Sequence, residues 1–340
     1  MSGGYNVAIV GATGMVGRAF IEVLKERNFP VKYWKLLASA RSADTKIDVG
    51  GEIHTIEEAK PEAFEGIDFA FFSAGGDISK ELAPEAAKKG AVVVDNSSAF
   101  RMNPDVPLVV PEVNPNAVNG HKGLISNPNC STIQMVVALQ PLQAAAGLKR
   151  VVVATYQAVS GAGKEAVDEL MEQSRAILNG QEPEKEVIPY KGASKHHQIA
   201  FNMVPHIDVM EENGYTKEEL KMINETRKIM DLENLPLTGT TVRVPVFNGH
   251  SEALNVELNQ PLSPLEARQL FSEAPGVVVM DEAAEFLYPM PVWTEGRDEV
   301  FVGRIRSDDS VPNGLNLWVV ADNIRKGAAT NSVQIAELLI

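Results

Sequence analysis

A glycine-rich turn near the start of the chain constrains its fold more than any other feature. The apolar run Tyr5–Val10 leads directly into GATGMVG, residues 11–17, and helical spacing follows over residues 16–27. Glycines at this spacing permit a tight turn, a close approach of the backbone to a pyrophosphate, and phosphate binding at a helix N-terminus. A plain strand–helix turn can also carry such glycines, but the position after the first strand favours nucleotide binding.

The segments after this turn continue to alternate between strand and helix patterns. Apolar runs at 34–38, 67–73 and 91–95 predict buried strands, and 84–89 predicts part of a helix between the last two. Such alternation implies parallel pairing of the strands. The sequence therefore predicts an α/β fold whose N-terminal domain is a Rossmann-type, doubly wound sheet.

The pattern changes after residue 130 and predicts a second domain. Helical patterns cover 132–146, 166–178, 215–230 and 264–272, and strand patterns cover 150–158, 242–247, 253–258, 276–280, 300–305 and 314–320. We therefore expect an α+β domain with a mixed sheet and helices on one face. The polar segment 179–205 is interpreted as a loop, and a last helix over 322–339 suits packing against the first domain.

Length and charge exclude several classes of protein. The 340 residues suit two domains, and 44% hydrophobic residues suffice for sizeable cores. The net charge of −14 argues against binding of nucleic acid or of an anionic membrane. We expect no signal peptide and no membrane span, since no run reaches the ~18 apolar residues required. A single cysteine suits a reducing, cytoplasmic location.

The end of the second predicted strand bears on the choice of dinucleotide. An NAD site commonly has an acidic residue there, which binds the ribose hydroxyls. This chain instead has Ser39, Arg41 and Ser42, which can bind a 2′-phosphate, so we predict NADP as the cofactor. A solvated loop arginine is the alternative, and Asp44 and Asp48 nearby leave some use of NAD open.

The only cysteine, Cys130, follows the turn-forming residues 127–129 and precedes an apolar helical run. At a helix start, the backbone dipole and free N–H groups lower the pKa of a thiol and favour the nucleophilic thiolate. A buried structural cysteine is the commoner alternative, but the surroundings here are polar. A nucleophile and a hydride carrier in one chain suggest a reductase or dehydrogenase that works through a thioester.

A partner base for this thiol has to come from six histidines. His250 differs from the others because it follows a predicted strand and a turn, a short distance after Arg243. Imidazole titrates near neutral pH and can both accept and return a proton. From the residues alone this pairing is only suggestive, and no ligand spacing indicates a metal site.

Longer motifs carry a family resemblance, and they occur in the order GATGMVG, SARS, DNSSAFR, SNPNCST, YQAVSGAGK, KEELKM, RVPVFNGHSEA and WVVADNIRKGAA. Over nearly its whole length the chain resembles bacterial aspartate-semialdehyde dehydrogenases, of the glyceraldehyde-phosphate-dehydrogenase-like superfamily. The resemblance implies NADP-dependent, reversible reductive dephosphorylation of 4-aspartyl phosphate to aspartate 4-semialdehyde, in the biosynthesis of lysine, diaminopimelate, threonine and methionine. It also implies a homodimer or homotetramer, with 130–321 as the catalytic and dimerisation domain and 1–129 with 322–340 as the NADP-binding domain.

The resemblance also assigns roles to individual residues. The catalytic set is Cys130 as nucleophile, His250 as acid and base, Gln157 at the substrate, and Asn129 at the oxyanion or thiol. The substrate-binding set is Arg243 for the α-carboxylate, Glu218 for the α-ammonium, and Arg101 and Lys221 for the phosphate. The cofactor-binding set is Gly11, Thr13, Gly14, Met15, Val16, Gly17, Ser39, Arg41, Ser42, Ser73, Ser160, Gly161 and Asn323.

Simpler explanations stand beside some of these roles. Glu218 and Lys221 lie three apart on a predicted helix and could pair with each other, and the adjacent Glu219 offers an assignment shifted by one position. Arg101 could form a surface ion pair.

Two other functions compete with the implied one. N-acetyl-glutamyl-phosphate reductases share the architecture, but they usually have glycine before the cysteine and an aromatic residue after it, where this chain has Asn129 and Ser131. A catalytically silent NADP-binding regulator is expected to lack the thiol, the imidazole or an anchor, and all are present here.

Overall fold

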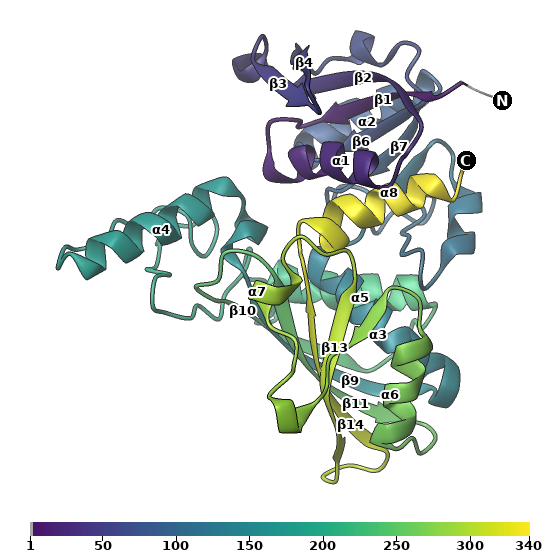
Figure 1. Ribbon diagram of the computed structural model, residues 1–340, viewed down its shortest axis with the longest axis vertical. Helices are drawn as coiled ribbons and strands as arrows, with labels where there is room; N and C mark the ends of the chain where they lie inside the picture. The colour runs from purple at the N-terminus through teal and green to yellow at the C-terminus, as the bar shows by residue number, and fades with distance from the viewer. Residues whose placement is uncertain (1–2) are drawn as a thin grey trace. The chain divides into compact units, whose positions relative to one another are not determined.

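The computed structural model describes residues 3–340, which form two compact units (Figure 1). The first unit contains the chain through Asn129 together with Ala328–Ile340, and the second contains Cys130–Gly327. The assignment of 322–340 to a nucleotide-binding domain stays a prediction about function. Within residues 3–340, no helix has the length and apolar character needed to cross a membrane.

The first unit is built on a six-stranded sheet in the order β5-β2-β1-β6-β7-β8, and every neighbouring pair is parallel. The strands are β1 (Tyr5–Val10), β2 (Val31–Ala38), β5 (Glu57–Glu58), β6 (Phe69–Phe72), β7 (Val92–Asp95) and β8 (Leu124–Ser126). The helices are α1 (Met15–Glu26), α2 (Gly76–Lys88) and α8 (Thr330–Glu337). This architecture confirms the predicted doubly wound sheet.

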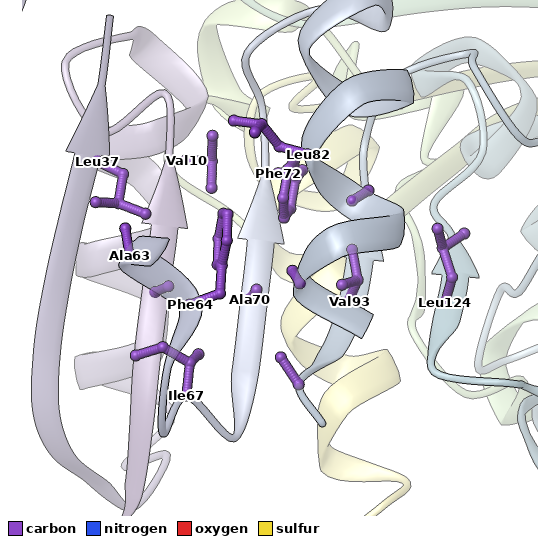
Figure 2. Packing of buried hydrophobic residues seen from close by; sticks show 14 of the residues in the cluster. Val10, Leu37, Ala63, Phe64, Ile67, Ala70, Phe72, Leu82, Val93 and Leu124 are labelled. Atoms are coloured by element: carbon purple, nitrogen blue, oxygen red, sulfur yellow. The ribbon is translucent and has the colours of Figure 1, made fainter. Parts of the chain in front are cut away.

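Apolar side chains fix this sheet between its helices. All four residues of β6 are buried, as expected for a parallel strand that is covered on both faces. Figure 2 shows one face, where Phe72 of β6 stacks on Phe64, with ring centroids 5.7 Å apart, and Leu82 of α2 packs in the same cluster. The C-terminal helix α8 packs on α1 and β7, and Arg27 forms a two-pronged ion pair with Glu337 at 2.7–2.8 Å.

The second unit contains a six-stranded mixed sheet in the order β10-β9-β11-β14-β13-β12. Its strands are β9 (Leu148–Gln157), β10 (Leu237–Arg243), β11 (His250–Leu258), β12 (Val277–Val279), β13 (Val300–Asp308) and β14 (Gly314–Ala321). The pairs β9–β10 and β12–β13 are parallel, and the central pairs are antiparallel. A mixed sheet is what the sequence predicts.

Helices pack on one face of this mixed sheet. They are α3 (Cys130–Ala146), α5 (Lys217–Met230) and α6 (Pro264–Glu273). The helix α4 (Lys164–Leu178) projects away from the sheet in teal in Figure 1, and the short α7 is Pro291–Thr294. Along β11 the residues that face the helices, such as Leu254 and Val256, are fully buried. The residues that alternate with them, Ala253 and Asn255, are half-exposed.

Some elements differ from the sequence-based expectation. In place of the strand predicted at 242–247, β10 begins at Leu237 and ends at Arg243. Pro245 lacks the N–H that continuation of a regular strand needs. A hairpin of β3 (Lys46–Val49) and β4 (Glu52–Thr55) was not predicted. The last helix is shorter than predicted, since residues 325–329 form a wider π-type turn before α8.

Candidate active site

The glycine-rich turn joins β1 to α1 with no room for side chains at two of its glycines. Gly11 has φ +89°, and a Cβ there would lie 2.7 Å from the carbonyl oxygen of Ser73. A Cβ on Gly17 would lie 2.1 Å from the carbonyl oxygen of Gly11. Since real Cβ contacts are never this short, the turn requires glycine at both positions, and Ser73 at the end of β6 lies directly beside it.

The same turn presents backbone N–H groups at the start of α1. Gly14 precedes the helix and provides no side-chain cap. The backbone N–H groups of the first turn can therefore bind an anion. Of the residues of this turn that were predicted to contact cofactor, Gly17 is buried, and the others are at least partly exposed: Gly11, Thr13, Gly14, Met15 and Val16. The local geometry fits a bound pyrophosphate.

The end of β2 has the residues expected for a 2′-phosphate. Ser39 precedes the single helical turn Ala40–Ser42, and both Ser39 and Arg41 are exposed. Ser42 is half-buried in the same turn. The predicted set is therefore gathered in one exposed turn at the carboxyl end of the sheet, where open α/β sheets bind their ligands.

Cys130 is the first residue of α3 and is half-buried. A Cβ on Gly327 would lie 2.8 Å from the Cβ of Cys130, so the chain approaches the cysteine there as closely as only glycine allows. The structure thus places Cys130 at a helix start, as the sequence predicts. Asn129, which precedes it, is buried.

Three neighbouring strands bring Gln157, Arg243 and His250 to one edge of the mixed sheet. Gln157 ends β9 and is paired in register with Arg243, which ends β10. His250 begins β11, on the other side of β9 and one residue beyond the Ser251–Tyr156 pair. The turn between β10 and β11 therefore returns His250 to the level of Arg243, which explains why the two residues are close although they lie on different strands.

His250 is fully buried, and its ring orientation is set by the backbone. The N–H of Ala158 donates to Nδ1 at 3.1 Å, so the neutral imidazole has its proton on Nε2. Among the described residues Nε2 has no hydrogen-bond partner. Burial and the charge of Arg243 lower the pKa of His250 to about 3, although Glu218 acts in the opposite direction. The imidazole is therefore neutral near physiological pH.

Arg243 is also buried, and one edge of its guanidinium is anchored. Its Nη1 donates to the carbonyl oxygen of Ala158 at 2.7 Å, while its Nε has no partner within the described part of the chain. Burial lowers the pKa of Arg243, and the charges of Glu218 and Cys130 oppose that change. A buried cation with an unsatisfied donor is suited to a carboxylate ligand.

Gly161 keeps the space between these two groups open. A Cβ on this residue would lie 3.0 Å from Nη1 of Arg243 and 3.1 Å from Nε2 of His250. Gly161 lies in the turn Val159–Ala162, directly after β9. Nε2 of His250 is therefore next to the space that a side chain at residue 161 would fill. This space suits the reacting end of a small polar substrate.

Glu218 and Lys221 lie on α5 and face the same strand ends. Gln157 donates from Nε2 to Glu218 at 3.3 Å, and Lys221 pairs with Glu218 at 3.2 Å and with Asp208 at 2.7 Å. The pairing of Glu218 with Lys221 that the sequence left open is thus present, and it coexists with the contact of Glu218 to Gln157. A carboxylate held by two neighbours is also placed to bind an ammonium group.

Glu219 has a different task. Its side chain accepts the N–H groups of Thr216 and Thr241, and Thr216 caps the start of α5 in return. This reciprocal capping box occupies the Glu219 carboxylate. It therefore argues against the alternative in which Glu219, in place of Glu218, binds the ammonium group.

Arg101 belongs to the first unit and is buried, so it is not the surface ion pair of the alternative explanation. It donates to the carbonyl oxygens of Asn127 and Asn96, each at 2.9 Å. In the second unit, Ser160 and Asn323 bond to each other, and Asn323 accepts the N–H of Gly249 at 2.9 Å. These bonds tie the turns beside His250 to the end of β14.

Family models match most of the chain. A model described as the NAD binding domain of semialdehyde dehydrogenase matches residues 6–121, and a model described as its dimerisation domain matches residues 139–326. The aspartate-semialdehyde dehydrogenase of Aquifex aeolicus is 59% identical over 99% of this chain and 98% of its own length. The chain belongs to the aspartate-semialdehyde dehydrogenase family. The Bacillus subtilis member is 55% identical over 100% of this chain and 98% of its own length.

Solved structures of the family have the same fold. Aspartate semialdehyde dehydrogenase II of Vibrio cholerae, crystallised with ASA, matches with a TM-score of 0.94 and 47% identity over 99% of this chain and 98% of that one. The Candida albicans enzyme, crystallised with NADP, matches with a TM-score of 0.76 and 26% identity over 99% of this chain and 98% of that one. For this chain the family supports a nicotinamide dinucleotide, and the comparisons favour this family over the two competing functions.

Asp208, which pairs with Lys221, was missed in the sequence analysis. It lies in an irregular loop with φ +68°, so no periodic pattern marks it. The capping box of Thr216 and Glu219 was also missed, although its spacing is visible in the sequence as a threonine followed three residues later by glutamate.

Proposed function

We propose that this chain catalyses the NADP-dependent, reversible conversion of 4-aspartyl phosphate to aspartate 4-semialdehyde and phosphate. The observation that carries the proposal is the meeting of Gln157, Arg243 and His250 at adjacent strand ends. A nucleophile, a carboxylate anchor and a proton-bearing imidazole are the groups that acyl transfer to a thiol requires.

Cys130 starts the reaction. Its thiolate, favoured by the start of α3 and by the nearby cation Arg243, attacks the acyl carbon of 4-aspartyl phosphate. The C–S bond forms, the C–O bond to phosphate breaks, and phosphate leaves as a weak base. Division of the reaction through a thioester replaces one difficult displacement by two easier steps.

Charged side chains hold the two ends of the substrate. Arg243 binds the α-carboxylate through its guanidinium, and Glu218 binds the α-ammonium with Gln157 beside it. Arg101 and Lys221 bind the phosphate. Asn129 is proposed to orient the thiol or the oxyanion, in keeping with its place directly before Cys130 in the chain.

His250 acts at the carbonyl oxygen. Because Nδ1 accepts the Ala158 N–H, the proton on Nε2 is the one offered to the oxyanion that forms when the thioester carbonyl is attacked. The same nitrogen takes part in the return of that proton as the hemithioacetal collapses to aldehyde and thiolate. A low pKa keeps the imidazole neutral for this task, an arrangement known from other enzymes that polarise a carbonyl.

NADPH, when bound, supplies the hydride that reduces the thioester carbon. Preference for NADP over NAD is supported by Ser39, Arg41 and Ser42 at the end of β2. Ser73 and the glycine turn would bind the dinucleotide in the first unit, and Ser160, Gly161 and Asn323 would lie toward the nicotinamide. We place the reaction in the cytoplasm, where Cys130 stays reduced.

Two copies of the chain are proposed to meet through the second unit. The family model for residues 139–326 describes a dimerisation domain. On the sheet face opposite the helices, Tyr156 and Trp318 are half-exposed, with ring centroids 5.5 Å apart. Apolar side chains of this kind favour contact with a second copy over water. Light scattering of the purified protein distinguishes a homodimer from a homotetramer and from a monomer.

The function is tested with aspartate semialdehyde, phosphate and NADP. Absorbance of the reduced nicotinamide should rise, and the rise should require all three components. N-acetyl-glutamate semialdehyde should give little signal, because its acylated nitrogen lacks the charge that Glu218 binds. Equal or faster turnover of the acetylated aldehyde would favour the competing reductase, and no turnover of either would favour a silent binding protein.

A further inference from the structure

Glu252 is a buried carboxyl group that the proposed mechanism does not use. It lies two residues after His250 on β11 and is fully inaccessible to solvent. No hydrogen-bond donor among residues 3–340 meets either of its oxygens with good geometry. A carboxylate in such a place is expected to be strongly destabilised unless it binds a proton.

The polar neighbour of Glu252 is Gln134 on α3. Burial raises the pKa of Glu252 well above its usual range. Hydrogen bonding by the Gln134 amide lowers this pKa, but the effect of burial is larger. Gln134 is also fully buried, and its Oε1 has no donor partner in the described part of the chain. Its Nε2 donates to the carbonyl oxygen of His250 at 3.3 Å.

We propose that Glu252 and Gln134 form a positioning pair that fixes the cysteine-bearing start of α3 against the histidine-bearing start of β11. Gln134 is one helical turn after Cys130 and bonds the backbone of His250, so a single amide connects the two elements that carry the reacting groups. This inference rests on the proposed function, since it concerns the same nucleophile and imidazole.

Protonation of Glu252 satisfies the polar atoms of the pair. A carboxylic acid has one O–H, which would donate to the orphaned Oε1 of Gln134. The second N–H of Gln134 would then donate to the other carboxyl oxygen, while the first keeps its bond to His250. An ionised Glu252 could accept the Gln134 N–H, but it has no proton to donate and leaves Oε1 of Gln134 unsatisfied, so the neutral acid matches the observed neighbours better.

Variants of Glu252 test the positioning role. Glu252→Gln replaces the acid by a neutral amide with a donor and an acceptor, and its kcat should stay within about threefold of the parent value. Glu252→Leu keeps the approximate volume but removes both functions. Its kcat should fall about tenfold or more, with KM within about twofold, because misplacement of reacting groups affects chemistry before binding. Glu257→Gln is the matched control, since Glu257 lies on the same strand and pairs at its half-exposed position with Lys149.

Two outcomes would overturn the proposal. One is a Glu252→Leu enzyme with the parent kcat, and the other is a Glu252→Gln enzyme as impaired as Glu252→Leu. If Glu252→Leu does not fold, as judged by circular dichroism, Gln134→Met is measured instead and must show the same loss of kcat at nearly constant KM.

A second measurement needs no activity and so separates this inference from the proposed function. The unfolded chain releases the Glu252 proton above about pH 4.5 while the folded chain retains it, so folding of the parent protein becomes less favourable as pH rises. The Tm of Glu252→Gln relative to the parent should therefore increase between about pH 5 and pH 8, and that of Glu257→Gln should not. A relative Tm that is independent of pH would contradict the neutral acid, even in a protein that fails to reduce any aldehyde.

Discussion

At the scale of single residues, Arg243 is a buried charge to which the proposed function assigns the substrate carboxylate. One nitrogen of its guanidinium is satisfied by the Ala158 carbonyl, whereas Nε has no partner among residues 3–340. A buried cation that is only partly satisfied destabilises the empty protein, and a carboxylate would compensate for this. The planar shape of the group also matches a carboxylate through two parallel bonds, which a lysine does not provide.

Replacement of Arg243 by lysine should therefore weaken substrate binding. We expect KM for aspartate semialdehyde to rise about 10- to 100-fold, equivalent to about 1.4–2.8 kcal/mol, because a point charge replaces the planar fork. Steady-state kinetics measure the effect, and Arg306→Lys at an exposed position of β13 is the control. An unchanged KM for the Arg243 variant would remove this residue from the carboxylate site.

The proposed preference for NADP over NAD depends most on Arg41. Glutamate at this position should repel a 2′-phosphate, so KM for NADP should rise about tenfold or more while KM for NAD changes little. Lys32→Glu, at an exposed position of the preceding strand β2, controls for a general change of surface charge. An equal effect on both dinucleotides would contradict the assignment of Arg41 to the 2′-phosphate.

At the scale of elements, the site depends on register between strands. Gln157 and Arg243 are paired across β9 and β10, and His250 is on the opposite neighbour of β9. The turn that contains Gly161 then passes in front of them without a side chain. One parallel and one antiparallel pairing thus bring three side chains from distant parts of the sequence together at this edge.

A methyl group at Gly161 should disrupt this edge. Gly161→Ala would place Cβ about 3 Å from both Arg243 and His250, and a displacement of these groups should lower kcat/KM about 100-fold. The fold should survive, with a Tm close to that of the parent. Gly192→Ala is the control, because the nearest atom to its Cβ would be 3.8 Å away. Parent-like kinetics for Gly161→Ala would show that the space is not used.

The sequence predicted the elements with strong periodic patterns and the residues within long motifs. It placed Cys130 at a helix start and β1, β6 and β7 in a parallel sheet, because these segments are apolar and bounded by turn residues. It misplaced β10, since the apolar residues after Arg243 resemble a strand, whereas the regular strand ends at Arg243 and Pro245 has no N–H to continue it. The contacts of Gln134, Asp208 and Glu252 depend on packing between distant elements, which no local pattern contains.

At the scale of the whole molecule, buried ionisable groups link stability to pH. His250 has an unfolded pKa near 6.5 and a folded pKa of about 3, so below pH 6.5 the unfolded chain binds a proton that the folded chain excludes. Stability from this residue is therefore present above about pH 6.5 and is lost as pH falls toward 3.

Denaturant unfolding of the parent and of His250→Gln should show this effect. The free energy of unfolding of the parent, relative to the variant, should fall by about 2 kcal/mol between pH 7 and pH 5, because each pKa unit corresponds to about 1.4 kcal/mol. The glutamine variant has no proton to gain at this position. A difference that stays constant over this range would show that His250 binds protons equally in both states.

The central claim is that Cys130 forms a covalent acyl intermediate. Intact-mass spectrometry of the protein mixed with aspartate semialdehyde and NADP, without phosphate, tests it directly, since phosphate is the acceptor that would release the acyl group. One aspartyl group is expected on Cys130, formed together with NADPH, removed by added phosphate, and absent from a Cys130→Ala variant that still binds NADP. NADPH formation without an adduct, or the same adduct on the alanine variant, would contradict it.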